Sequence, residues 1–279
     1  MSYKTISTVV HDLQHPLGAM EAAINISRDL AAHLSVLAVG IDITEPSFYY
    51  AGAEAVTMAD NLERARESAN ELKAAVDARL ARSDINWDVQ HVTLQLSAFN
   101  SYIGNNTRFS DLVVLPKPYG PERNAQDQTI AEAALFSAGC PVLFVPESGQ
   151  VPKPGGRVLL AWNNGDEALA AARAALPYLH AASLVEIIII DPPQHAPDRS
   201  DPGGALAQYL SRHGVTCEIA VLAKTEPRIC DILLHRAKEM DCDLVVMGAY
   251  GHSRMREAIF GGATRTMMEK ADVPVLMSR

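Results

Sequence analysis

The chain has 279 residues, of which 48% are hydrophobic and 20% are charged, a composition typical of a soluble folded protein. The net charge of −9 argues against general nucleic-acid binding, which needs clustered Lys and Arg to neutralise phosphates. No apolar run approaches the roughly 20 residues that cross a bilayer, and the first residues show no signal-peptide core. We therefore expect a cytoplasmic protein with neither a membrane nor a nucleic-acid partner.

The four cysteines and the distribution of charge narrow the range of functions further. Cys140, Cys217, Cys230 and Cys242 form no CxxC pair and no zinc-type spacing, so we expect buried free thiols and no metal site. Residues 1–150 hold 10 Lys+Arg against 18 Asp+Glu, whereas residues 151–279 hold 14 against 15. The second half is therefore the half that better tolerates an anionic ligand.

The sequence contains an internal repeat of about 140 residues. Four segments of the first half recur in order in the second: "STVVHD" (7–12) as "VLLAWN" (158–163), "SVLAVGID" (35–42) as "LVEIIIID" (184–191), "SDLVVLPKPYG" (110–120) as "CDLVVMGAYG" (242–251), and "CPVLFVP" (140–146) as "VPVLMS" (273–278). A Pro- and Gly-rich join separates the copies. We expect a domain over 1–148, a linker over 149–155 and a second domain over 156–279.

Within each half, strand-like apolar runs alternate with helical stretches. In the second half the predicted strands are 157–162, 183–190, 216–222, 244–247 and 275–277, and the predicted helices are 166–180, 204–213, 227–240 and 263–270. The first half follows the same order with a longer helix over 54–81, whose predicted buried face holds Leu62, Ala65, Ala69, Leu72, Val76 and Leu80. This alternation predicts an α/β fold, with a doubly wound parallel sheet of five strands in each half.

The most distinctive segment is a glycine-rich loop, "GAYGHSRMREAIFGG", at residues 248–262. It leaves the carboxyl end of a predicted strand, where open parallel sheets bind ligands. Gly248 and Gly251 allow a close backbone approach, and Gly261 and Gly262 precede a predicted helix whose free N–H groups suit phosphate. Arg254 is a candidate for a phosphate contact. The loop predicts an anion site, although a purely structural turn remains the alternative.

The spacing G-x2-G-x9-G after "DLVVMG" and before a helix and "VPVLM" resembles the universal stress protein family, along the whole chain as two tandem copies. The resemblance implies two Rossmann-like domains that pair their last strands as a pseudo-dimer, an ATP or AMP ligand, and Mg with ATP. A homodimer is a further expectation. The implied binding residues are Asn163, Ile190, Met247, Gly248, Gly251, Arg254, Gly261, Gly262 and Thr264.

Both halves depart from the family pattern. Gly262 stands where Ser or Thr is usual, and Asn163 stands where an Asp normally ends the first strand. The first half keeps that acid as Asp12, but Pro116 and Tyr119 replace its first two glycines. We therefore expect the first site to be closed.

These observations leave two functional hypotheses. In the first, the protein is a stress-response sensor or regulator that binds an adenine nucleotide in its second half, with slow ATP hydrolysis at most because no catalytic base is identified. In the second, it is a nucleotide-free interaction module with a relic glycine loop. An adenylyl-transfer enzyme is disfavoured because its signature motifs are absent.

Overall fold

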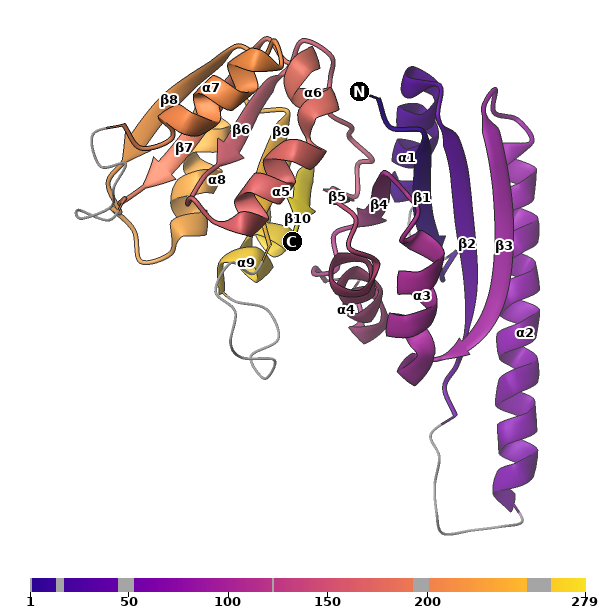
Figure 1. Ribbon diagram of the computed structural model, residues 1–279. Coiled ribbons are helices and arrows are strands. Elements are labelled where there is room, and N and C mark those ends of the chain that lie inside the picture. Colours follow the sequence, from indigo (N-terminus) through magenta and orange to yellow (C-terminus); the bar gives the residue numbers. More distant parts are fainter. Residues whose placement is uncertain (1, 14–17, 45–52, 122, 193–200, 250–261) are drawn as a thin grey trace.

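The computed structural model describes residues 2–13, 18–44, 53–121, 123–192, 201–249 and 262–279. Its strands form one ten-stranded sheet in the order β3-β2-β1-β4-β5-β10-β9-β6-β7-β8. Five strands come from each half of the chain, and the two halves lie side by side (Figure 1). The expected α/β fold with two tandem five-stranded units is confirmed.

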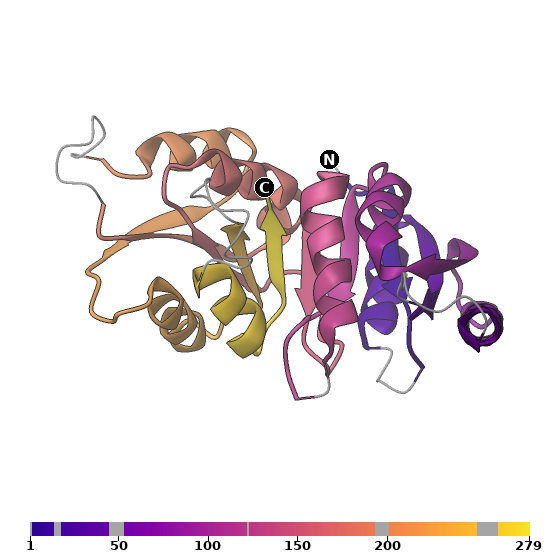
Figure 2. The ribbon, with the colours of Figure 1, turned by 90° about the horizontal axis from the view of Figure 1, so that it is seen from below.

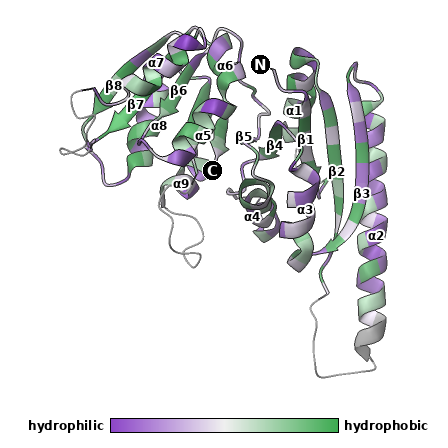
Figure 3. Cartoon of the chain, in the orientation of Figure 1, coloured by the Kyte–Doolittle hydropathy of each residue, from purple (hydrophilic) through white to green (hydrophobic). Residues whose placement is uncertain are grey.

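The N-terminal half follows the predicted alternation of strands and helices. Its elements are β1 (Thr5–Val10), α1 (Gly18–Leu30), β2 (His33–Asp42), α2 (Ala53–Leu80), β3 (Asn86–Gln95), the 3-10 turn η1 (Leu96–Ala98), α3 (Phe99–Thr107), β4 (Leu112–Pro116), α4 (Ala125–Glu132), the π-helical turn η2 (Ala133–Ala138) and β5 (Val142–Val145). On α2, five of the six residues of the predicted buried face are buried, and only Leu62 is half-buried. Figure 3 shows hydrophilic residues interspersed with apolar ones along this helix.

The C-terminal half repeats this order. Its elements are β6 (Arg157–Ala161), α5 (Asp166–Ala174), α6 (Leu176–Ala181), β7 (Leu184–Ile190), α7 (Gly204–Arg212), β8 (Cys217–Leu222), α8 (Ile229–Glu239), β9 (Leu244–Gly248), α9 (Gly262–Lys270) and β10 (Val275–Ser278). The predicted helix 166–180 is in fact two helices. Pro177 stands in the first turn of α6, where its missing N–H costs nothing, whereas inside a continuous helix it would break a hydrogen bond.

Two hydrophobic clusters cover the two faces of the sheet. One contains buried residues of α1, α2, α5, α6 and α7, and the other contains those of α3, α4, η2, α8 and α9. Figure 2 shows this layering in the C-terminal half, with α7 on one side of the strands and α8 and α9 on the other. Strand residues join the two clusters alternately, as the pleat of a sheet requires.

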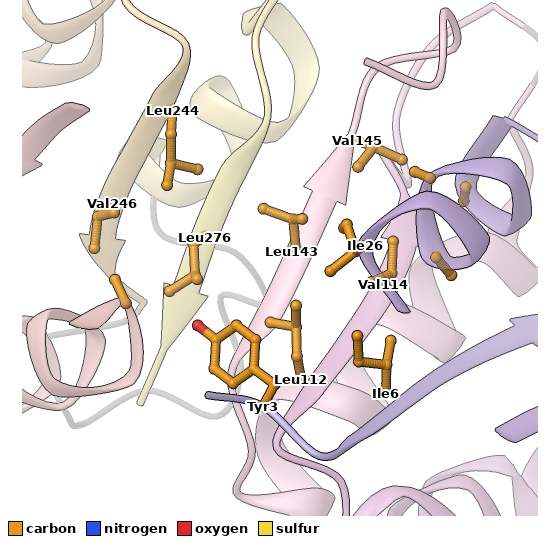
Figure 4. Close-up of a cluster of buried hydrophobic side chains, with 14 of the residues drawn as sticks. Tyr3, Ile6, Ile26, Leu112, Val114, Leu143, Val145, Leu244, Val246 and Leu276 are labelled. Atoms are coloured by element: carbon orange, nitrogen blue, oxygen red, sulfur yellow. The ribbon is translucent and has the colours of Figure 1, made fainter. Parts of the chain in front are cut away.

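The seam between the halves is the antiparallel pair β5·β10. Leu276 lies opposite Leu143 and Val275 opposite Phe144, and the pairs on either side of β5 and β10 are parallel. Leu143 and Leu276 both belong to the hydrophobic cluster on the face of the sheet that α1 covers, and Figure 4 shows them on the two neighbouring seam strands. The expected pairing of the two last strands is therefore confirmed, and each core cluster runs across the seam without interruption.

In the described part of the chain, no helix is both long enough and apolar enough to span a bilayer. All four cysteines are free thiols, and all but the half-buried Cys217 are buried. Burial raises the pKa of Cys140, Cys230 and Cys242 to about 11, so these thiols stay protonated at neutral pH. Among the same described residues, no cluster of His, Cys, Asp and Glu is suited to a metal.

Candidate functional site

The candidate site lies at the carboxyl ends of β6 and β9, where the strand order of the C-terminal half reverses. From β6 the chain continues outward to β7, and from β9 it crosses to β10 on the other side. Ala161 pairs with Ile188, and Leu160 pairs with Val246. Continuing this register brings Asn163, Ile190 and Ala249 to the same edge of the sheet. Ligands of open α/β sheets bind at such a reversal point.

Asn163 shapes the turn between β6 and α5. Its side-chain oxygen accepts a hydrogen bond from the backbone N–H of Gly165 at 3.0 Å, and its amide nitrogen donates to the carboxylate of Glu167 at 3.0 Å. Gly165 is the N-cap residue of α5. Asn163 thus organises the turn that leads into α5, and its amide also holds Glu167 at the edge of the site.

Gly248 lies against the first turn of α5. A Cβ atom built there would be 2.4 Å from Cγ of Glu167 and 2.7 Å from the backbone nitrogen of Ala168. Such contacts are too short for any side chain, so glycine is required for β9 to pass α5. The structural interpretation of this glycine therefore holds whether or not a ligand binds.

Gly262 and Thr264 begin α9, the helix that follows the loop. A Cβ atom at Gly262 would meet no atom within 4 Å, so nothing in the described structure requires glycine there. Thr264, which is in the first turn of the helix, is buried, with 4% of its surface exposed. The other loop residues of the prediction, Gly251, Arg254 and Gly261, fall in the segment 250–261, outside the described residues.

Met247 and Ile190 lie in the strands beneath the site. Met247 pairs with Met277, and its side chain packs in the core on the α8–α9 face. Ile190 ends β7 and is half-buried. From these positions their backbones reach the carboxyl edge, whereas the side chain of Met247 points into the core.

The basic residues of α9 make contacts away from the site. The guanidinium carbon of Arg265 lies 5.0 Å from the ring centroid of Tyr119 in the N-terminal half. Lys270 donates to Asp231 of α8 at 3.0 Å. Within the described residues, these two cations are therefore engaged by Tyr119 and Asp231.

At the equivalent place in the N-terminal half, side chains fill the space. Asp127 of α4 lies 3.6 Å from His11 and 3.5 Å from Arg123, and it also accepts from the backbone of Asn124 as part of a capping box. The remaining cavity beside Pro116 measures about 10 Å³, room for a single water molecule. This packing supports the expectation of a closed first site.

The chain is similar in sequence to known proteins. Residues 156–279 match the model of the universal stress protein family. The chain is also 25% identical over 176 residues to the universal stress protein Slr1230 of Synechocystis, a match that covers 61% of this chain and 58% of that protein. The match to the family model therefore lies in the C-terminal half of the chain.

Solved structures extend the likeness in fold to both halves. A universal stress protein from Archaeoglobus fulgidus superposes with a TM-score of 0.72 at 15% identity, covering 99% of this chain and 98% of that one. A putative universal stress protein from Pseudomonas aeruginosa gives a TM-score of 0.58 at 14% identity, covering 99% and 93%. At these identities the likeness concerns the fold alone, and it includes the tandem arrangement.

Sequence reasoning missed one residue of the site. Glu167 contacts Asn163, and its side chain occupies the space that a Cβ at either Gly165 or Gly248 would need. The family pattern places an acid at the end of the first strand, and here that position holds Asn163. The signal that could have identified Glu167 is its position in the first turn of the next helix, four residues after Asn163.

Proposed function

We propose that the C-terminal half binds an adenine nucleotide, ATP or AMP, at the carboxyl edge of β6 and β9, with Mg accompanying ATP. The observation that carries the proposal is the intact G-x2-G-x9-G spacing between β9 and α9, located at the reversal point of the sheet. The backbone N–H groups at the start of α9 would donate hydrogen bonds to phosphate oxygens. Gly251, Gly261 and Arg254 would complete that contact.

In this proposal, Glu167 takes over the task of the missing strand-end acid. Its carboxylate is held by the amide of Asn163 beside the ends of β6 and β9. Ribose hydroxyls donate well to a carboxylate, which is the usual partner of a nucleotide sugar in Rossmann-like sites. The backbones of Ile190 and Met247 would border the base.

The biological role that follows is that of a sensor or regulator. A ligand that binds only the folded form stabilises it, and the population of the bound form follows nucleotide concentration. Hydrolysis would be slow at most, because the proposal assigns no general base and no Lys–Mg arrangement of a dedicated NTPase. We further propose that residues 1–148 and 156–279 are separate domains joined by the linker 149–155, and that the closed first site serves only packing.

The alternative is a nucleotide-free interaction module. Two observations favour it: packing against α5 alone accounts for Gly248, and Arg265 and Lys270 are engaged elsewhere. An unneutralised Glu167 would also repel phosphate if the phosphates lay close to it.

Thermal unfolding with and without millimolar Mg-ATP separates the two functions. Binding would raise the melting temperature by several degrees in the wild type. A Gly251→Glu variant should lose the shift, whereas Gln208→Glu, which adds the same charge on the exposed face of α7, should keep it. Absence of a shift in the wild type, with no nucleotide released on denaturation, would refute nucleotide binding and favour the interaction module.

A further inference from the structure

The loop that replaces the glycine motif in the N-terminal half is in direct contact with α9. It leaves β4 at Pro116, and the backbone N–H of Lys117 donates to Val145 of β5 at 3.3 Å. The loop therefore starts beside β5, the seam strand of its own half, which pairs with β10. From there two of its side chains cross to the helix that follows the glycine loop of the other half.

The first crossing contact is an ammonium at the carboxyl end of α9. Nζ of Lys117 donates to the carbonyl of Ala271 at 2.7 Å and lies 3.4 Å from the carbonyl of Glu269. A cation at this end of a helix satisfies carbonyls that have no partner in the helix and interacts favourably with the helix dipole. The site is partly desolvated, and burial lowers the pKa of Lys117. Lys117 thus caps a helix that belongs to the other half of the chain.

The second crossing contact is a cation–π pair. Tyr119 is 7% exposed, and the guanidinium of Arg265 lies over its ring at 5.0 Å. Desolvation raises the pKa of Tyr119, so the ring stays neutral beside this cation. Because Arg265 is on the second turn of α9 and Ala271 lies just beyond its last turn, the two contacts hold the helix near both ends.

The contacts are not reciprocal. By the internal repeat, Lys117 and Tyr119 correspond to Ala249 and Gly251, neither of which has a side chain that could make these contacts. Tyr119, one of the two substitutions expected to close the first site, also supplies one of the two contacts to α9. The N-terminal loop therefore contacts α9 of the other half instead of lining a ligand site at its own sheet edge.

We propose that Lys117 and Tyr119 form a brace that fixes α9, and that through this brace the N-terminal half sets the nucleotide affinity of the C-terminal half. The inference rests on the proposed function, because it assigns regulation to that site. The start of α9 must be held in place to receive phosphate. A helix that is already fixed binds more tightly than one that the ligand has to order.

Lys117→Met tests the brace because it keeps most of the aliphatic stem and removes the ammonium. Its control is Lys224→Met, at an exposed position beyond β8. Without nucleotide, amide hydrogen exchange over Gly262–Lys270 should be about fivefold or more faster in Lys117→Met than in the wild type and in the control. Tyr119→Leu should accelerate the exchange in the first turns of the same helix.

Calorimetric titration with Mg-ATP tests the coupling. We expect Lys117→Met to bind about five- to tenfold more weakly than the wild type and Lys224→Met to bind equally well. Unchanged exchange in both brace variants would overturn the brace, and faster exchange with unchanged affinity would overturn its control of the site. If the wild type binds no nucleotide, the proposed function fails and the regulation fails with it, whereas the exchange rates still decide whether the brace exists.

Discussion

The side-chain amide of Asn163 donates a 3.0 Å hydrogen bond to the carboxylate of Glu167, and this pair explains why an amide suits the end of β6. An Asp at position 163 would place two carboxylates within hydrogen-bond distance of each other. An amide instead of an acid at position 163 is therefore what lets the carboxylate of Glu167 lie beside the end of β6.

Asn163→Asp should lower the free energy of unfolding by about 0.5 kcal/mol at pH 7 through like-charge repulsion. The repulsion raises the pKa of one carboxyl in the folded state above its unfolded value. The loss is therefore full at neutral pH and disappears as the pH falls through that raised pKa. Urea unfolding at pH 7 and pH 4 measures the difference. Adding Glu167→Gln should restore stability, and a double variant as unstable as the single one would contradict this account.

Gly262→Ser should tighten Mg-ATP binding a few-fold and stabilise the apo protein by about 0.5 kcal/mol. A Cβ at this position meets none of the described residues, and the new hydroxyl restores the residue usual in the family. Serine also has a higher helix propensity than glycine. Gly262→Ala is the matched control, since it should give the stability without the tighter binding. Calorimetry and urea unfolding report the two effects separately, and equal affinities for Ser and Ala would rule out the hydroxyl contact.

Gly248→Ala should destabilise the protein by about 1–3 kcal/mol even without nucleotide, because its Cβ would collide with the backbone of α5. Chemical denaturation measures this loss. Gly262→Ala, at the other end of the same motif, should show no loss. A stable Gly248→Ala protein would mean that β9 and α5 are further apart than the structure places them.

Tyr3 and Tyr178 form an edge-to-face pair with ring centroids 5.7 Å apart, yet their hydroxyls differ. The hydroxyl of Tyr3 donates to the carbonyl of Ala174 at 2.6 Å, whereas that of Tyr178 is buried without a partner among the described residues. We expect Tyr3→Phe to cost about 1 kcal/mol and Tyr178→Phe to be neutral or stabilising. Urea denaturation of the two variants decides, and equal losses would show that the two hydroxyls are equivalent.

Stability should fall as the pH rises above about 10. Burial raises the pKa values of Tyr3, Tyr119 and Tyr178, so the folded state keeps these protons while the unfolded chain releases them. The contribution is fully present below the unfolded pKa and is lost as the pH rises through the folded values. Melting temperatures between pH 8 and pH 11 test this trend, and Tyr119→Phe should reduce its slope.

The sequence determined the architecture because it repeats local signals that act over short distances. Alternating Val-rich strands and amphipathic helices predicted every strand of the C-terminal half to within one residue at each end. The β5·β10 seam was expected only from the resemblance to a known family. The split at Ala175 was missed, because the apolar pattern continues through it while Pro177 favours a new helix start.

Only the tertiary structure decided how the site is built. Motif spacing identified Gly248 and Gly262 together, but their surroundings differ: Gly248 is packed against α5, whereas a Cβ at Gly262 would meet none of the described residues within 4 Å. Arg265 follows the glycine loop closely in the sequence, whereas its guanidinium lies over the ring of Tyr119, 146 positions earlier in the chain. Periodicity and motifs reflect the local requirements of each segment, whereas a contact such as Lys117 to Ala271 depends on how the two halves of the sheet join, which no single segment encodes.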